Sequence, residues 1–143
     1  MTTRRTFVAG SLAAAAALAL PVSARAEARS ARIRTRDSTE LHVKEWGASG
    51  RTVIFTHAWP LSADIWDYQA AALAEAGHHV IAYDRRGFGR SSQPTAGYDF
   101  DTLSDDLAAV IAETGARDIT LVGYSMGGGE VGGYFSRHGG KQE

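Results

Sequence analysis

Apolar and polar residues alternate with a period of two in two neighbouring segments, Ala31–Thr35 and Glu40–Trp46. Because this period is typical of half-buried strands, and the polar pair Asp37-Ser38 separates the segments, the pattern predicts an antiparallel hairpin. Three later runs are apolar almost throughout, as expected of strands covered on both faces: Arg51–Thr56, Val80–Tyr83 and Ile119–Val122.

Helical spacing of apolar residues fills the gaps between these runs. It predicts one helix over Asp64–Ala76 and a second that begins at Thr102, where Asp105 completes a capping-box-like start, and stops at Gly115. A third helix is expected after the last run. A hairpin followed by strand-helix alternation predicts an α/β fold with a mainly parallel sheet, in which sites lie at the carboxyl ends of strands.

The first 26 residues have a different composition from the rest. Arg4-Arg5 precedes the uncharged stretch Thr6–Ala24, and the small-x-small pattern Ala24-Arg25-Ala26 follows. This layout is typical of a signal peptide, and Arg4-Arg5 resembles the twin-arginine export consensus. We expect cleavage after Ala26, a domain over residues 27–143, and a periplasmic or secreted location.

A membrane anchor is the alternative for the same stretch, because its 19 uncharged residues reach the roughly 18 that a spanning helix needs. Its high alanine content and Pro21 argue against a stable anchor. Cleavage would leave 117 residues with 12 basic and 16 acidic side chains.

The composition describes an ordinary globular chain that is long enough for one domain, with 143 residues, 44% hydrophobic and 22% charged. Its net charge of -1 offers no basic field, so we expect no nucleic-acid partner. The absence of cysteine excludes disulfides, thiolate nucleophiles and cysteine-based metal sites.

Gly123-Tyr124-Ser125-Met126-Gly127 has the pattern G-x-S-x-G between a predicted strand and a predicted helix. In that context the serine projects from a tight turn where a base can reach it, which makes Ser125 a candidate nucleophile. A serine that only caps the helix is the alternative. Residues 127–132 also match the dinucleotide fingerprint, but no acidic residue follows about twenty positions later.

Three motifs occur in order: His57-Ala58-Trp59-Pro60-Leu61 after the central strand, the loop Asp84–Ser91, and Ser125–Val131. Together they resemble the α/β-hydrolase family over residues 32–140, and within it the cofactor-free chloroperoxidase, aryl esterase and perhydrolase branch. The resemblance implies that Ser125 attacks an ester carbonyl while the backbone N–H groups of Trp59 and Met126 hold the oxyanion.

The same resemblance implies small-molecule partners, an ester or a carboxylic acid together with peroxide, and no metal, haem or other cofactor. Two features depart from the family pattern. Ala58 replaces a glycine, and would displace the Trp59 donor if that turn needs a positive φ. Five glycines also lie in the last predicted helix, at positions 127, 128, 129, 132 and 133, which should weaken it.

The triad of this fold continues with an acid and a histidine on later strands. Only 18 residues follow Ser125, and they hold Glu130, Glu143 and His138. Glu130 and His138 belong to the helix that starts at Ser125, so neither is expected to reach its hydroxyl. We therefore expect the N-terminal part of a hydrolase, inactive alone and open to a complementing C-terminal chain; a non-catalytic truncated domain or binding fragment is the alternative.

Other side chains near the motifs receive structural interpretations. His57 precedes the oxyanion turn and is expected to be a hydrogen-bonded structural histidine rather than a general base. Asp84 is expected to pair with Arg85 and Arg86 and so brace its loop. The aromatic residues Trp59, Trp66 and Phe88 either line an acyl pocket or fill the core.

Overall fold

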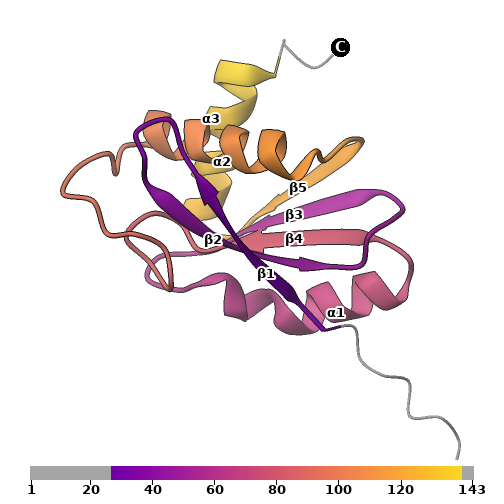
Figure 1. Ribbon diagram of the computed structural model, residues 1–143. Helices are drawn as coiled ribbons and strands as arrows, with labels where there is room; N and C mark the ends of the chain where they lie inside the picture. The colour runs from indigo at the N-terminus through magenta and orange to yellow at the C-terminus, as the bar shows by residue number, and fades with distance from the viewer. Residues whose placement is uncertain (1–26, 140–143) are drawn as a thin grey trace, which may run out of the picture.

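The computed structural model describes residues 27–139 and contains one sheet flanked by helices (Figure 1). The strands are β1 (Arg29–Arg34), β2 (Glu40–Trp46), β3 (Thr52–Thr56), β4 (His79–Tyr83) and β5 (Ile119–Gly123). The helices are the 3₁₀ turn η1 (Ala63–Trp66), α1 (Asp67–Glu75), α2 (Phe100–Thr114) and α3 (Met126–His138). The signal-peptide prediction concerns residues outside the described range.

The sheet has the strand order β1-β2-β4-β3-β5. β1 and β2 form the predicted antiparallel hairpin, and β2 pairs antiparallel with β4. β3 pairs in parallel with both β4 and β5, so the described sheet is mixed, with its parallel part towards β5. The α/β fold predicted from the alternation of strands and helices is confirmed.

Side chains on β3 and β4 point alternately to two cores. Val53 and Phe55 pack in the core that contains Ala70 of α1, whereas Ile54 belongs to the core that contains Leu107 of α2. Figure 1 shows the corresponding layers, with α1 below the sheet and α2 and α3 above it. Both faces of β3 and β4 are covered, which explains their apolar sequences, whereas β5 at the edge of the sheet is only half-buried, contrary to the expectation for Ile119–Val122.

The helix starts differ in detail from those predicted. The first predicted helix begins as the 3₁₀ turn η1 and becomes α1 only at Asp67. α2 begins two residues early, because Asp99 is its N-cap and accepts a hydrogen bond from the Thr102 N–H at 2.9 Å. The expected capping box of Thr102 and Asp105 is therefore wrong. No helix within residues 27–139 is long and apolar enough to cross a membrane.

The connections reverse direction around β3. The chain passes from β3 through α1 to β4 on one side, and then through α2 to β5 on the other side. In an open α/β sheet such a reversal separates the loops at the carboxyl ends of the two neighbouring strands, and ligands bind in the crevice between them. The topology therefore directs attention to the loops that leave β3 and β5.

Candidate active site

The loops that leave β3 and β5 begin side by side. Thr56 and Gly123 are partners in the parallel register, and the Tyr124 N–H donates to the Thr56 carbonyl at 3.1 Å. The predicted oxyanion turn starts at the next residue of one strand, and the predicted nucleophile turn starts at the next residue of the other. The fold thus brings the two motifs, which lie 68 residues apart at His57 and Ser125, to one edge of the sheet.

Ser125 occupies a backbone conformation that an L-residue rarely adopts, with φ 53° and ψ -115°. The residue is exposed and immediately precedes α3, yet its side chain makes no capping hydrogen bond. A capping serine has an extended backbone and accepts a bond from the helix, so the alternative of a simple cap does not fit. Such strained residues cluster at active sites, and a sharp strand-to-helix turn exposes the serine hydroxyl.

The glycines of the pentapeptide are required by close contacts. A Cβ on Gly123 would lie 2.5 Å from the Gly127 carbonyl oxygen, and a Cβ on Gly127 would lie 2.5 Å from the carbonyl oxygen of Thr56. The Thr56 hydroxyl also donates to the Gly127 carbonyl at 3.0 Å. Only glycine lets the first turn of α3 approach β3 and β5 this closely, and this approach creates the turn at Ser125.

The two predicted oxyanion donors are available for a ligand. Among residues 27–139, the N–H groups of Trp59 and Met126 donate to no protein acceptor. Ala58 is buried and is absent from the residues with positive φ, so its methyl group fits the turn of this chain without backbone strain. The predicted displacement of the Trp59 donor depended on a positive φ at this position, which the turn does not have.

His57 has the contacts of a structural histidine. Its Nε2 accepts the Arg85 backbone N–H at 2.9 Å, and its Nδ1 lies 2.9 Å from the Ala58 carbonyl oxygen. A carbonyl only accepts, so Nδ1 carries the proton and the ring is neutral. Burial, assisted by the charge of Arg85, lowers the pKa of His57 to about 4. The unprotonated nitrogen, Nε2, already accepts the Arg85 backbone N–H, so its lone pair is not available to accept a proton from a reacting group.

Arg85 forms a buried ion pair that the sequence does not reveal. Its Nε and Nη2 donate to the Glu130 carboxylate of α3 at 2.9 and 2.7 Å, and the Tyr83 hydroxyl donates to the same carboxylate. Burial raises the pKa of Glu130 and lowers that of Arg85 to about 10. Both Arg85 bonds go to one oxygen, Glu130 Oε2, while Tyr83 donates to the other, and these charge-assisted hydrogen bonds offset part of the cost of burial.

Asp84 does not pair with Arg85 or Arg86, contrary to expectation. Its carboxylate accepts the side chain of Arg90 at 3.0 Å and the backbone N–H of Ala63 at 2.8 Å. Arg86 instead binds Asp106 of α2 and Asp37 of the hairpin turn, at 2.6 and 2.8 Å. The loop after β4 is braced as predicted, but through other partners.

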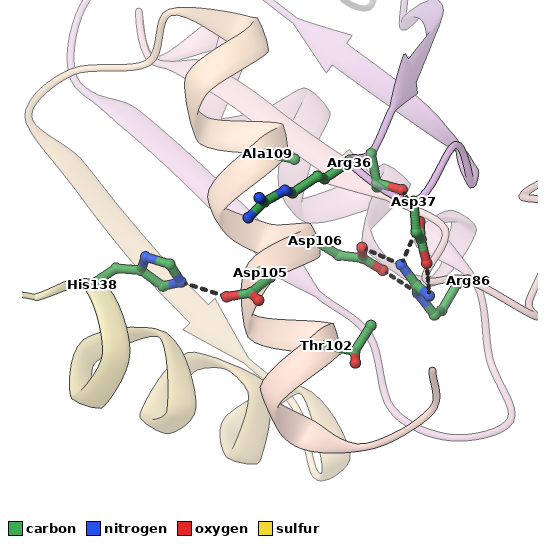
Figure 2. A pocket seen from close by; sticks show the side chains of 9 residues that line it. Arg36, Asp37, Arg86, Thr102, Asp105, Asp106, Ala109 and His138 are labelled. Carbon is green, nitrogen blue, oxygen red and sulfur yellow. Dashed lines mark hydrogen bonds and ion pairs between the residues drawn. The ribbon is translucent and has the colours of Figure 1, made fainter. Parts of the chain in front are cut away.

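Arg86 lies at a hollow of about 600 Å³ between the hairpin turn, α2 and the end of α3 (Figure 2). Asp37 and Asp106 converge on Arg86, while His138 bonds to Asp105 at 2.8 Å. Ser125 does not line this hollow. Within residues 27–139, no three His, Asp or Glu side chains group closely enough to hold a metal ion.

The remaining candidates are His138 and three aromatic side chains. His138 is the last residue of α3, so twelve helical steps of 1.5 Å, about 18 Å, separate it from Met126. Trp66 stacks on Phe55 at 4.4 Å and packs, half-buried, against the core on the α1 side, whereas Trp59 is 67% exposed. Phe88 packs edge-on against His57 at 5.6 Å.

Comparisons with known proteins agree with this geometry. A family model described as "alpha/beta hydrolase fold" matches residues 51–143. The chain is 50% identical over 105 residues to the non-heme chloroperoxidase CPO-A1 of Kitasatospora aureofaciens, covering 73% of this chain and 38% of that protein. It is 44% identical over 107 residues to a bifunctional esterase/perhydrolase of Acinetobacter calcoaceticus, covering 74% and 39%.

A solved structure shows the same arrangement. The bromoperoxidase of Bacillus anthracis superposes with a TM-score of 0.73 at 45% identity, covering 78% of this chain and 40% of that chain. The chain thus spans about two-fifths of the length of the proteins it matches.

Proposed function

Since the chain belongs to the alpha/beta hydrolase family, we propose that Ser125 is the nucleophile of a serine hydrolase that acts on carboxylic esters. The strained, exposed and uncapped conformation of Ser125 carries this proposal. A serine held in this way serves no purpose in the helix that follows it, whereas a nucleophile needs such exposure.

The proposed reaction begins when the Ser125 hydroxyl attacks the ester carbonyl carbon and gives up its proton to a base. The carbonyl π electrons move onto oxygen, and the N–H groups of Trp59 and Met126 donate to the resulting oxyanion. Collapse of this intermediate expels the alcohol, which regains a proton, and leaves an acyl group on Ser125. Loss of one such donor typically costs about 2.7–4 kcal/mol in the barrier.

The acyl group can then pass to water or to hydrogen peroxide. Attack by water releases a carboxylic acid, while attack by peroxide releases a peracid, which can oxidise a halide. The names of the similar proteins include both chloroperoxidase and esterase/perhydrolase, which supports peroxide as a second substrate. We therefore propose a small ester or carboxylic acid, with peroxide, as the partners of the site and no cofactor.

The isolated chain is proposed to be inactive. Within the described part of the chain, no histidine or carboxylate bonds to the Ser125 hydroxyl, and His57 is occupied by its structural contacts. Triad members act as a unit, so a serine without its base retains only weak assistance from the oxyanion donors. A complementing C-terminal chain would have to supply the base and its acid.

A fluorophosphonate probe tests this proposal directly. The chain is incubated with the probe, alone and mixed with the C-terminal three-fifths of the Acinetobacter esterase/perhydrolase, and labelled peptides are mapped by mass spectrometry. We expect labelling of Ser125 only in the mixture, abolished by Ser125→Ala and unaffected by Ser136→Ala on α3. Labelling elsewhere, or none in a mixture shown to form a complex, would favour a non-catalytic binding fragment.

Export remains a separate proposal for the segment before the described residues. The intact mass of the protein from its native host should be lower by the mass of Met1 to Ala26 if cleavage follows Ala26. Replacing Arg4 and Arg5 by lysine should retain the full-length form inside the cell if export uses the twin-arginine route. An unprocessed mass in the exported fraction would contradict cleavage.

A further inference from the structure

Arg85 lies between the two segments that carry the proposed oxyanion donors. The side chain is 1% exposed, and its Nη2 donates both to the His57 carbonyl at 2.8 Å and to Glu130 at 2.7 Å. His57 stands two residues before Trp59, and Glu130 stands one helical turn after Met126. One guanidinium thus connects the loop after β3 with the first turns of α3.

Arg85 orients the Trp59 N–H through its hydrogen bonds to His57. The Arg85 backbone N–H holds His57 Nε2, and His57 Nδ1–H donates to the Ala58 carbonyl, each at 2.9 Å. That carbonyl and the Trp59 N–H belong to one planar trans peptide, in which they point in opposite directions. Fixing the Ala58 carbonyl therefore fixes the direction of the Trp59 N–H.

Arg85 holds the Met126 N–H through its ion pair with Glu130 on α3. Met126 and Glu130 are four residues apart and lie on the same helix face. The Glu130 carboxylate is held by Arg85, and Arg85 Nη1 also lies 3.8 Å from Met126 Sδ. The first turn of α3 is thereby tied to the side chain whose Nη2 also holds the His57 carbonyl, two residues before the other donor.

We infer that Arg85 is a positioning residue that sets the two oxyanion donors, the N–H groups of Trp59 and Met126, relative to each other. The inference rests on the proposed function. Donors that are fixed before the reaction stabilise the developing oxyanion without reorganisation. Their relative orientation therefore affects the stability of the transition state more than the binding of the substrate. In an assembled enzyme, a change at Arg85 should therefore lower kcat and leave KM nearly unchanged.

Arg86 provides a matched control. It is the next residue, is also 1% exposed, and also makes charge-assisted bonds to a buried carboxylate, that of Asp106. Its partners lie on α2 and in the hairpin turn, away from both donor segments. Arg86→Lys should thus reproduce the loss of stability caused by Arg85→Lys without its effect on the donors.

The test measures backbone order parameters by nitrogen-15 relaxation on the whole chain. We expect values near 0.85 for the amides of Trp59 and Met126 in the unchanged chain and in Arg86→Lys, and values below about 0.6 in Arg85→Lys. The inference is overturned if both amides are already below about 0.6 in the unchanged chain, if Arg85→Lys leaves them rigid, or if Arg86→Lys loosens them equally.

A second variant covers the case in which Arg85→Lys does not fold. Glu130→Gln preserves the side-chain shape but removes the charge that holds Arg85, so the Met126 amide should lose order while the Trp59 amide, held through His57, changes less. An unchanged Met126 amide would overturn the inference. Failure of Ser125 to react with the fluorophosphonate in the mixture with the C-terminal segment would refute the proposed function and leave these order parameters as an independent result.

Discussion

α2 and α3 pack against each other above the sheet, yet their sequences make them helical in different ways (Figure 1). α2 has the usual signals of a stable helix: Asp99 caps its start, and Gly115 ends it in the left-handed conformation with φ 64°. Its buried face includes Leu103, Leu107 and Val110. This helix is specified by its own residues and by one apolar face.

α3 lacks most of these signals. It starts at the strained Ser125 without a side-chain cap, contains five glycines, and buries the charged side chain of Glu130. Each interior glycine costs roughly 1 kcal/mol relative to alanine, so the helix depends on contacts with its neighbours. The sequence of α2 therefore stabilises the helix itself, whereas the glycines of α3 lower its intrinsic helix stability and allow its first turns to lie close to the sheet.

The largest expected effect concerns the buried charge of α3. Glu130→Ala leaves Arg85 buried without its partner, and should lower the free energy of unfolding by about 3–5 kcal/mol in urea denaturation. Glu113→Ala, on the exposed face of α2, is the control and should change it by less than about 0.5 kcal/mol. Equal changes in the free energy of unfolding for the two variants would contradict the view that α3, unlike α2, depends on a buried charged side chain.

Gly133→Ala should have the next largest effect. A Cβ at this position would collide with Ser104 Oγ of α2, a buried side chain bonded to the Phe100 carbonyl at 2.6 Å. We expect a loss of about 1–3 kcal/mol by chemical denaturation, the usual cost of overpacking. If Gly133→Ala proved stabilising, the close packing of α3 on α2 would not be the reason for this glycine.

Local signals explain why so much could be predicted from the sequence. Strand runs, helix periodicity and the pentapeptide around Ser125 each depend on residues close together in the chain, and the structure contains the corresponding elements. The start of α2 was missed by two residues, because Asp99 lies outside the apolar repeat that marks the helix.

Partners distant in the sequence could not be predicted. Arg85 and Glu130 are 45 residues apart, and no local pattern in either segment indicates that the two side chains are partners. Asp84 bonds to Arg90 and to Ala63 on the α1 side of the sheet, whereas Arg85 and Arg86 both bond to the helices on the other side. The available signal was that Glu130 is the one charged residue between Met126 and Phe135, since a charge on the packed face of a helix requires a partner.

Ser125→Gly tests whether the turn before α3 is strained. Glycine adopts positive φ without steric cost, so the substitution should raise the free energy of unfolding by about 1–2 kcal/mol, despite the greater freedom of glycine in the unfolded chain. Ser125→Ala keeps a Cβ and should leave stability nearly unchanged. Equal stability of the glycine and alanine variants would show that the serine conformation stores no strain.

Gly132→Ala should act in the opposite direction to Gly133→Ala. A Cβ at Gly132 would meet no atom within 4 Å, so nothing in the described part of the chain requires glycine there. Alanine should stabilise the helix by about 1 kcal/mol, seen as a higher Tm. A lower Tm would mean that a group outside residues 27–139 packs on this position.

The smallest expected effect separates the two helix starts. Asp99→Ala should lower the Tm, because α2 loses the acceptor for the Thr102 N–H, whereas the corresponding change at Ser125 removes no cap. The bonds from the Thr102 backbone and hydroxyl lower the pKa of Asp99. Its stabilising effect is therefore complete above the pKa of the unfolded chain and is lost as the pH falls through the lower, folded value. The Tm difference between the unchanged chain and Asp99→Ala should shrink at acidic pH in thermal scans, and a difference independent of pH would mean that the uncharged carboxyl caps the helix equally well.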